Sequence, residues 1–183
     1  MPEVARLINE VEDARGRFLE ATFAFSPEQA HFKPAPERWS IVEITEHIVR
    51  AEQGGIAGMW KAVEGAETGR PVWQGDPPHH GKSIEQIIAE TWKEKEEVPP
   101  VAAPSWGGPL ALWIAALQAN AGLLRDLGRA LQHHDLEALH YPHPISGALD
   151  MRQRFEFLRF HMDRHRNQVE ELARHPAFPE RPR

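Results

Sequence analysis

The amino-acid sequence predicts an all-α protein: a four-helix bundle with one additional short helix and a long loop, in a single domain over residues 1–183. Apolar residues recur at the 3.6-residue period of an amphipathic helix along most of the chain. No run of alternating β-branched residues bounded by turn signals predicts a strand. Because each apolar stripe must be buried against another helix, several long amphipathic helices indicate a bundle.

The first helix is predicted to end before the tetrad "SPEQ", which begins a short capped turn. Ser26 suits the N-cap, Pro27 suits the first helical position, and Gln29 can bond back to the N-cap backbone. The stripe that predicts the first helix consists of Val4, Leu7, Ile8, Val11, Phe18 and Phe25.

The second long helix is predicted to begin at the capping box Ser40-x-x-Glu43, after the loop "PAPERWS". Three glycines between residues 54 and 58 favour a kink or a close helix approach. Residues 65–82 are rich in Pro and Gly and predict a surface loop or lid. The core stripe of this helix is Ile41, Ile44, Ile48 and Ala51.

Two further helices are expected after this loop. The capping box Ser83-x-x-Gln86 opens a third helix that is predicted to reach about Val98. A segment rich in helix-breaking residues follows, and Pro109 begins a fourth helix. Its apolar face is formed by Leu110, Ile114, Leu117, Ala121, Leu124 and Leu131.

The last helix is predicted from Asp150, which suits the N-cap with Gln153 at the third position, to about Arg174. The connection before it is expected to contain at most one short turn, starting at Asp135. Residues 176–183 are predicted to be an irregular tail, since their prolines cannot continue a helix.

The charge and the cysteine content exclude several classes of protein. A net charge of −6, with acidic and basic residues interspersed, argues against a nucleic-acid partner. No stretch is apolar and long enough to suggest a membrane partner, and the polar N-terminus is unlike a targeting peptide, so a cytoplasmic location is expected. Because there is no cysteine, any metal must be bound by nitrogen and oxygen ligands.

Histidine is unusually frequent, with 11 copies, and His161 and His165 are four residues apart, which places them on one face of the last helix. The apolar pattern puts His165 where a core residue is expected. A buried imidazole needs partners for its ring nitrogens, and a metal ion can be one of them. With so many histidines such a pair also arises by chance, so a hydrogen-bonded core histidine beside a surface histidine remains an alternative.

A third histidine, His47, lies on the flank of the core stripe of the second long helix. If that helix neighbours the last one, three imidazoles converge on one point. Three protein ligands leave coordination positions open, as in catalytic rather than structural metal sites.

Two segments resemble the DinB/YfiT-like family of metalloenzymes. "ERWSIVEITEHIVRAE" (37–52) resembles its tryptophan, serine, helix and histidine signature, and "HPISGALDMRQRFEFLRFHMDRHRNQV" (143–169) resembles its closing loop and H-x-x-x-H helix. The resemblance covers nearly the whole chain and implies a four-helix bundle. It also implies that His47, His161 and His165 bind one divalent metal ion per chain, such as zinc, nickel or iron.

The resemblance further implies a small-molecule substrate and a homodimer. A three-nitrogen site with open positions suits a metal-dependent hydrolase, or an S-transferase that uses a low-molecular-weight thiol bound in a groove beside the 65–82 loop. The alternative is a non-catalytic, stress-associated bundle that binds a metal or a ligand. No catalytic residue is assigned, because the sequence contains no legible Ser-His-Asp arrangement, glycine-rich phosphate loop or paired carboxylates of a di-iron bundle.

Other polar residues receive weaker predictions. Trp39 is expected to pack at the start of its helix rather than contact a substrate. Gln168 is expected to be solvated or to serve packing, with a contact to the metal site as the alternative, and Asn120 to flank an apolar helix or line a cavity. His79 is expected in a solvated loop with its neighbour His80, and His143 in a structural role.

Overall fold

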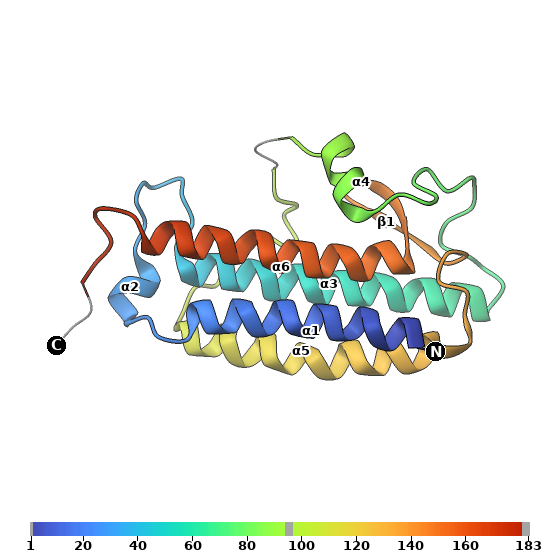
Figure 1. The fold of residues 1–183 in the computed structure, drawn as a ribbon, viewed down its shortest axis with the longest axis horizontal. Coiled ribbons are helices and arrows are strands. Elements are labelled where there is room, and N and C mark those ends of the chain that lie inside the picture. The colour runs from blue at the N-terminus through green and yellow to red at the C-terminus, as the bar shows by residue number, and fades with distance from the viewer. Residues whose placement is uncertain (1, 94–96, 181–183) are drawn as a thin grey trace.

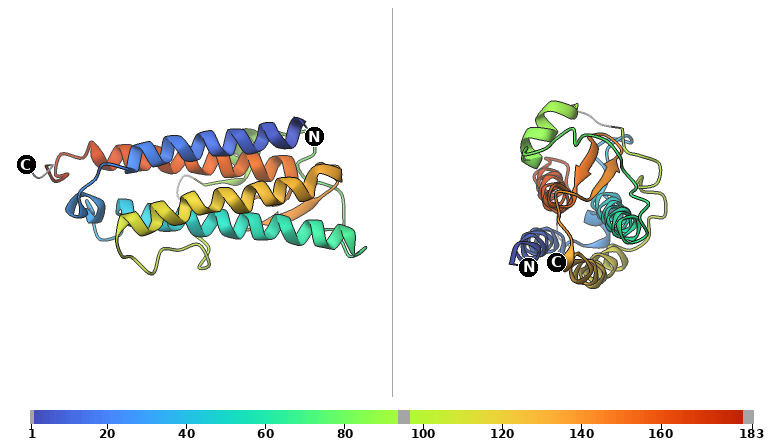
Figure 2. Two further views of the ribbon diagram at one scale, coloured as in Figure 1. Left: turned by 90° about the horizontal axis from the view of Figure 1, so that it is seen from below. Right: turned by 90° about the vertical axis from the view of Figure 1, so that its right-hand side faces the viewer.

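Four long helices form one bundle in the computed structural model, which describes residues 2–93 and 97–180 (Figure 1). The long helices are α1 (Pro2–Thr22), α3 (Ile41–Glu67), α5 (Leu110–Ala130) and α6 (Met151–Ala173), which confirms the predicted four-helix bundle. Helix α1 packs against α5 and α6, and α3 packs against the same two helices, so α1 and α3 lie on one diagonal. Helices α1 and α6 run in one direction, and α3 and α5 run in the other (Figures 1 and 2).

The helix directions account for the lengths of the connections. Helix α2 (Pro27–His31) lies in the turn between α1 and α3, which run in opposite directions. Because α3 and α5 are parallel neighbours, the chain between them must return along the bundle, and this long connection carries the short helix α4 (Ile84–Thr91). A 3₁₀ turn, Leu131–His133, follows α5.

Two predicted helix boundaries are wrong. Helix α4 ends at Thr91 rather than near Val98, because Trp92 turns into extended backbone and its indole donates a hydrogen bond to Ser146 Oγ at 2.9 Å. Part of the predicted extension, residues 94–96, lies outside the described residues. Helix α3 continues to Glu67, into the segment predicted as loop.

A two-stranded antiparallel hairpin, β1 (His140–His143) and β2 (Gly147–Asp150), contradicts the prediction that no strand is present. The hairpin is short and lacks the alternating pattern of an independent strand, so its packing on α3 stabilises it. At this contact, a Cβ on Gly58 would lie 2.5 Å from Tyr141 Cε1. Gly58, and to a lesser degree Gly55 beside Leu158, therefore serve a close approach, whereas Gly54 faces open space; the helix continues without interruption through all three.

All four predicted capping boxes are present, at the starts of α2, α3, α4 and α6. In each box the N-cap side chain accepts a hydrogen bond from the N3 backbone, and the N3 side chain accepts one from the N-cap backbone. These local interactions explain why the predicted helix starts agree with the structure.

A buried ion pair lies inside the bundle, where α1, α3 and α5 meet. Arg15 on α1 forms an ion pair with Glu52 on α3, and both side chains are almost completely buried. The second carboxylate oxygen of Glu52 accepts a hydrogen bond from Asn120 on α5 at 2.8 Å. Gln53 in turn donates to Asn120 at 3.0 Å. Asn120 therefore supports this ion pair and is not among the residues that line the cleft described below.

Substitution of Glu43 by glutamine is expected to remove a pH-dependent part of the stability. Burial alone would raise the pKa of Glu43, but hydrogen bonds from Ser40 and Lys33 outweigh it and hold this pKa below 4.5. A lowered pKa in the folded state contributes stability that is present above pH 4.5 and is lost as the pH falls through the folded pKa. Glutamine keeps an acceptor for the capping box but loses the charge that pairs with Lys33, so Glu43→Gln should cost about 0.2 to 1 kcal/mol at neutral pH.

Urea unfolding across the acid range measures this effect. The free energy of unfolding of the Glu43→Gln variant should depend less steeply on pH below 4.5 than that of the wild type. Glu90, whose carboxylate pairs with Lys82 at an exposed position, offers a matched control. An equal change of slope in Glu90→Gln would contradict the role given to Glu43.

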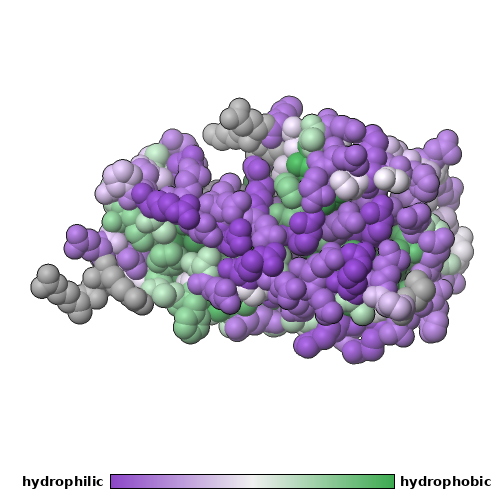
Figure 3. All heavy atoms as spheres, viewed as in Figure 1, coloured by the Kyte–Doolittle hydropathy of each residue, from purple (hydrophilic) through white to green (hydrophobic). Residues whose placement is uncertain are grey.

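The exterior is mostly hydrophilic on the face shown in Figure 3. An apolar area lies at the end of the bundle where α1 ends and α2 begins, and Phe23, which follows α1, is 80% exposed. Within the part of the chain that the structure describes, none of the helices combines the length and the apolar character needed to cross a membrane.

Candidate metal centre

The three histidines that the sequence singled out come together between α3 and α6. His47 lies two turns into α3, while His161 and His165 lie on successive turns of the neighbouring α6, and all three side chains are buried. Nε2 of His161 lies 3.2 Å from Nε2 of His47 and 3.0 Å from Nε2 of His165. One nitrogen of each ring lies within 4.8 Å of the other two, so the three rings present their nitrogens to one point.

Hydrogen bonds at the outer nitrogens define the tautomers of two of these rings. His47 Nδ1–H donates to the backbone carbonyl of Ala102 at 2.8 Å. His165 Nδ1–H donates to Oε1 of Gln168 at 2.7 Å. In a neutral imidazole only one nitrogen carries a hydrogen, so Nε2 of His47 and of His165 both present lone pairs. His161 Nε2 can donate at most one hydrogen, and at least one close pair of nitrogens has none between them.

Burial lowers the pKa of each of the three histidines. For His161 the pKa lies well below 6.5, with burial as the main cause and the neighbouring rings of His165 and His47 adding to it. Burial and then His47 lower the pKa of His165 to about 3, and burial lowers that of His47. The rings are therefore neutral at pH 7 and available as ligands.

This donor set fits a single divalent cation. Metal–nitrogen bonds of about 2.0 to 2.1 Å in a tetrahedral site separate neighbouring ligand atoms by about 3.3 Å, close to the nitrogen separations within the cluster. A cation would also satisfy the lone pairs that have no hydrogen between them. Three ligands leave at least one coordination position open, which is the arrangement of catalytic metal sites.

Aromatic side chains pack against the histidines. The ring of Trp39 lies 4.9 Å from that of His47 and stacks at 6.4 Å on that of His165, between ring centroids. Phe157 stacks on His161 at 5.2 Å. Trp39 packs at the start of α3 as predicted, and the structure adds that it also walls the histidine cluster. These rings restrain the orientation of the imidazoles.

The remaining polar predictions have mixed outcomes. Gln168 contacts the site by accepting the hydrogen bond from His165, so the alternative prediction for this residue is the correct one. His143 has the expected structural role, since its Nδ1 accepts hydrogen bonds from the backbone N–H groups of Ile145 and Ser146 in the hairpin turn. His79 is not simply solvated, because its Nε2 lies 2.7 Å from the Ser146 carbonyl oxygen.

A cleft of about 1340 Å³ opens onto the three histidines. Its walls come from α3, α6, the hairpin, the loop before α3, and the segment between α4 and α5, which contributes Trp92, residues 97–99, Val101 and Ala102. None of the lining residues comes from 65–82, so that loop does not wall this cleft. A groove for a thiol beside the 65–82 loop stays a prediction.

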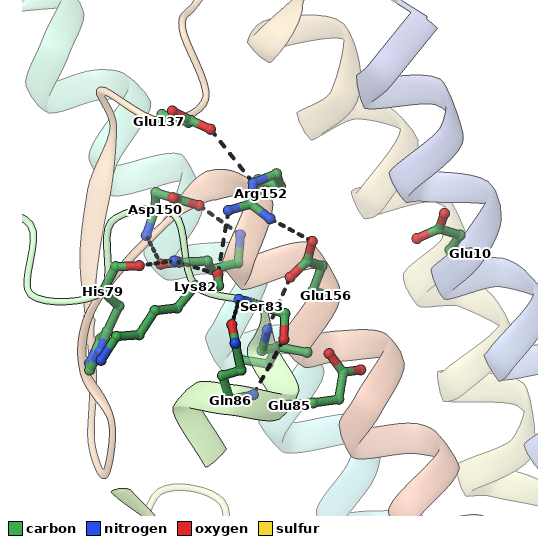
Figure 4. Close-up of polar contacts among 12 residues, drawn as sticks. Glu10, His79, Lys82, Ser83, Glu85, Gln86, Glu137, Asp150, Arg152 and Glu156 are labelled. Atoms are coloured by element: carbon green, nitrogen blue, oxygen red, sulfur yellow. Dashed lines mark hydrogen bonds and ion pairs between the residues drawn. The ribbon is translucent and has the colours of Figure 1, made fainter. Parts of the chain in front are cut away.

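The C-terminal part of the 65–82 segment is attached at the start of α6. The carbonyl oxygens of His79 and Lys82 accept hydrogen bonds from the Gln153 side chain at 2.7 and 3.2 Å. Figure 4 shows these contacts beside the ion pair between Arg152 and Glu156. The Glu156 carboxylate also accepts a hydrogen bond from the backbone N–H of Ile84 at the start of α4. The predicted lid is thus held by several polar contacts at its C-terminal end.

Glu46 is a functional residue that the sequence did not reveal. Its fully buried carboxylate accepts hydrogen bonds from the backbone N–H groups of Ser105, Trp106 and Gly107, and it pairs with Arg50. These bonds hold the segment whose Ala102 carbonyl orients His47. No sequence signal identified this role, because the partners are backbone groups from a distant loop.

Glu46→Gln is expected to loosen this segment and with it the orientation of His47. Glutamine has one acceptor oxygen where the carboxylate has two, so at least one N–H group loses its partner, at a cost of about 1 to 3 kcal/mol. Removal of such an outer partner of a metal ligand typically weakens metal binding by about 10- to 100-fold. Urea unfolding and competitive zinc titration measure the two effects. Glu64→Gln, at an exposed position of the same helix, should change neither, and an equal loss there would refute the assignment.

Fold and cluster together define a four-helix-bundle protein with a buried three-histidine site able to hold a metal ion. A model of the DinB superfamily matches residues 10–169, and the chain belongs to this superfamily. Among solved structures, YfiT from Bacillus subtilis matches with a TM-score of 0.60 and 13% sequence identity, over 93% of this chain and 86% of that one. YfiT is described as a probable metal-dependent hydrolase with an unusual four-helix bundle topology. No curated protein matches the chain.

Proposed function

We propose that this protein is a metal-dependent hydrolase of a small molecule, with His47, His161 and His165 holding one divalent cation, either zinc, nickel or iron. The observation that carries the proposal is the convergence of three neutral imidazole nitrogens at the base of a cleft. A bound divalent cation supplies Lewis acidity, which acidifies a nucleophile and polarises a substrate carbonyl or phosphoryl oxygen. The description of YfiT supports the same class of reaction.

The residues of this chain have defined tasks in such a reaction. Ala102 and Gln168 keep the Nδ1 hydrogens of His47 and His165 outward, so that both Nε2 lone pairs face the site. Three neutral ligands leave the full positive charge of a cation available to the substrate. The aromatic rings of Trp39 and Phe157 exclude water from the histidine side of the cleft, which strengthens electrostatic interactions there.

Transfer of a low-molecular-weight thiol is the second candidate function. The observation that favours it is the volume of the cleft, about 1340 Å³, which exceeds the roughly 300 to 1,000 Å³ typical of a pocket for one small ligand. A thiol cosubstrate and an acceptor therefore have room together. The expected homodimer remains a prediction.

The test begins with elemental analysis of protein purified without a histidine tag. About one divalent ion per chain is expected. Hydrolysis of chromogenic esters, amides and phosphate esters is then assayed in the metal-loaded protein, after chelation, and after readdition of zinc, nickel or iron; thiol conjugation is assayed in parallel. Turnover that is lost on chelation and restored by metal supports an enzyme. Stoichiometric metal without turnover in either assay would favour the non-catalytic alternative, and absence of bound metal would overturn both.

A further inference from the structure

Arg154 is a buried cation that has no anionic partner among the residues that the structure describes. Its exposed fraction is 5%, and its Nη1 has no hydrogen-bond partner among the described residues. No ion pair joins it to any residue in the described part of the chain. Its neighbour Arg152 differs, because it pairs with Glu156 and Glu137 at the start of α6 (Figure 4). Burial of an unpaired charge is costly, so a cation in this state calls for a partner that the described residues do not provide.

The position of Arg154 connects it to the metal centre. Arg154 lies seven residues before His161 on α6, which is two helical turns, so both side chains project from one face about 10 Å apart along the axis. Both residues line the same cleft. The guanidinium lies over the ring of Tyr141, 5.6 Å from its centroid, on the hairpin side of the cleft.

A second donor lies close to this guanidinium. His143 also lines the cleft, and its Nδ1 accepts two backbone hydrogen bonds, so the hydrogen of the neutral ring is on Nε2. Burial and then the positive charge of Arg154 lower the pKa of His143 to about 3, which keeps this ring neutral. The walls between these donors and the metal centre include the aromatic rings of Trp92 and Phe157.

We infer that Arg154, assisted by His143, forms an anion-binding subsite that takes a carboxylate group of the substrate. A guanidinium offers a planar fork of N–H donors that matches a carboxylate, and one positive charge balances one carboxylate. The aromatic walls suit an apolar substrate body that extends toward the histidine cluster. This subsite rests on the proposed function and deepens it: the substrate class is a small molecule with an apolar body and one carboxylate.

Calorimetric titration of the full chain with benzoate, benzamide and phenyl phosphate tests the subsite, on protein as purified and after metal removal. Benzoate should bind at least 10-fold more tightly than its neutral analogue benzamide in both forms. Arg154→Met should weaken benzoate binding by about 10-fold or more and abolish this preference. Arg159→Met removes another arginine of α6, one that pairs with Glu85 of α4, and it should leave benzoate binding unchanged. Arg154→Lys keeps the charge without the fork and should bind benzoate with intermediate affinity.

Thermal unfolding separates a ligand-binding role from a structural one. If Arg154 is kept for a ligand, Arg154→Met should raise the unfolding temperature of the ligand-free protein, by about 2 to 4 °C. A lower unfolding temperature would assign Arg154 to packing on Tyr141 and overturn the inference. Benzoate binding unchanged by Arg154→Met but lost on metal removal would also overturn it, while leaving the proposed metal function intact. Tighter binding of phenyl phosphate than of benzoate would refute the carboxylate assignment.

Discussion

Replacement of His161 by alanine is expected to weaken metal binding by about 100-fold or more. His161 is the central residue of the cluster, since its Nε2 lies within 3.2 Å of Nε2 of both His47 and His165. Apparent zinc-binding free energies of about 10 to 16 kcal/mol in four-ligand sites correspond to roughly 3 kcal/mol per ligand, and each 1.4 kcal/mol is a factor of 10 in affinity. Without His161, the other two imidazoles stand on different helices and bind a cation only as a pair.

Elemental analysis and competitive zinc titration measure this loss. The wild type should retain about one divalent ion per chain after dialysis, and the His161→Ala variant should retain little. His80→Ala provides the matched control, because His80 is exposed in the loop before α4. Equal metal content in His161→Ala and the wild type would place the metal elsewhere and end the proposal of a three-histidine site.

Substitution of Glu52 by alanine is expected to have the largest effect on stability, a loss of about 3 to 5 kcal/mol. Glu52 is 2% exposed, and its two oxygens serve Arg15 and Asn120. Alanine leaves the buried guanidinium with Glu12, a partly exposed carboxylate, as its one remaining partner among the described residues, and it leaves the Asn120 amide with only the longer bond to the Val49 carbonyl. The cost comes from these poorly satisfied buried polar groups rather than from the lost ion pair as such.

A double substitution separates the cost of stranded polar groups from the contribution of the ion pair. Replacement of both partners, Arg15→Met with Glu52→Leu, removes the pair and strands neither charge, so its cost should be much smaller than that of Glu52→Ala. Urea unfolding gives the free energies. Glu10→Ala, which breaks the exposed pair with Arg6, should cost less than about 1 kcal/mol. A loss below about 1 kcal/mol in Glu52→Ala would show that Glu12 alone compensates Arg15, and it would contradict the role given to Glu52.

Much of the helical architecture was predictable because its signals are local. The boxes at Ser26, Ser40, Ser83 and Asp150 involve residues three apart, and each begins a helix where the sequence indicated one. The hairpin was missed because four-residue strands carry little pattern and depend on packing against α3. The end of α4 was misplaced because a hydrogen bond from Trp92 to the hairpin decides it.

For the candidate site, the sequence by itself determined which types of ligand atom are available and which helix face carries His161 and His165. The absence of cysteine left nitrogen and oxygen ligands, and the spacing of His161 and His165 placed both on one helix face. Their contact with His47 was only conditional, because periodicity says which face of a helix is apolar but not which helix covers it. The spacing also placed Arg154 on the same helix face as His161 and His165. Whether the charge of Arg154 is paired, however, depends on neighbours that the sequence does not reveal.

Only the tertiary structure decided what surrounds these residues. It brought α3 beside α6, supplied the Ala102 carbonyl that orients His47, and left Arg154 buried without a carboxylate partner among residues 2–93 and 97–180. A backbone carbonyl is the same at every position of a chain, so no sequence motif can announce it as a partner. Likewise, an unpaired charge is a property of everything within a few ångströms in space. Local hydrogen bonding and periodicity are written in neighbouring residues, whereas the environment of a site depends on segments far apart in the chain.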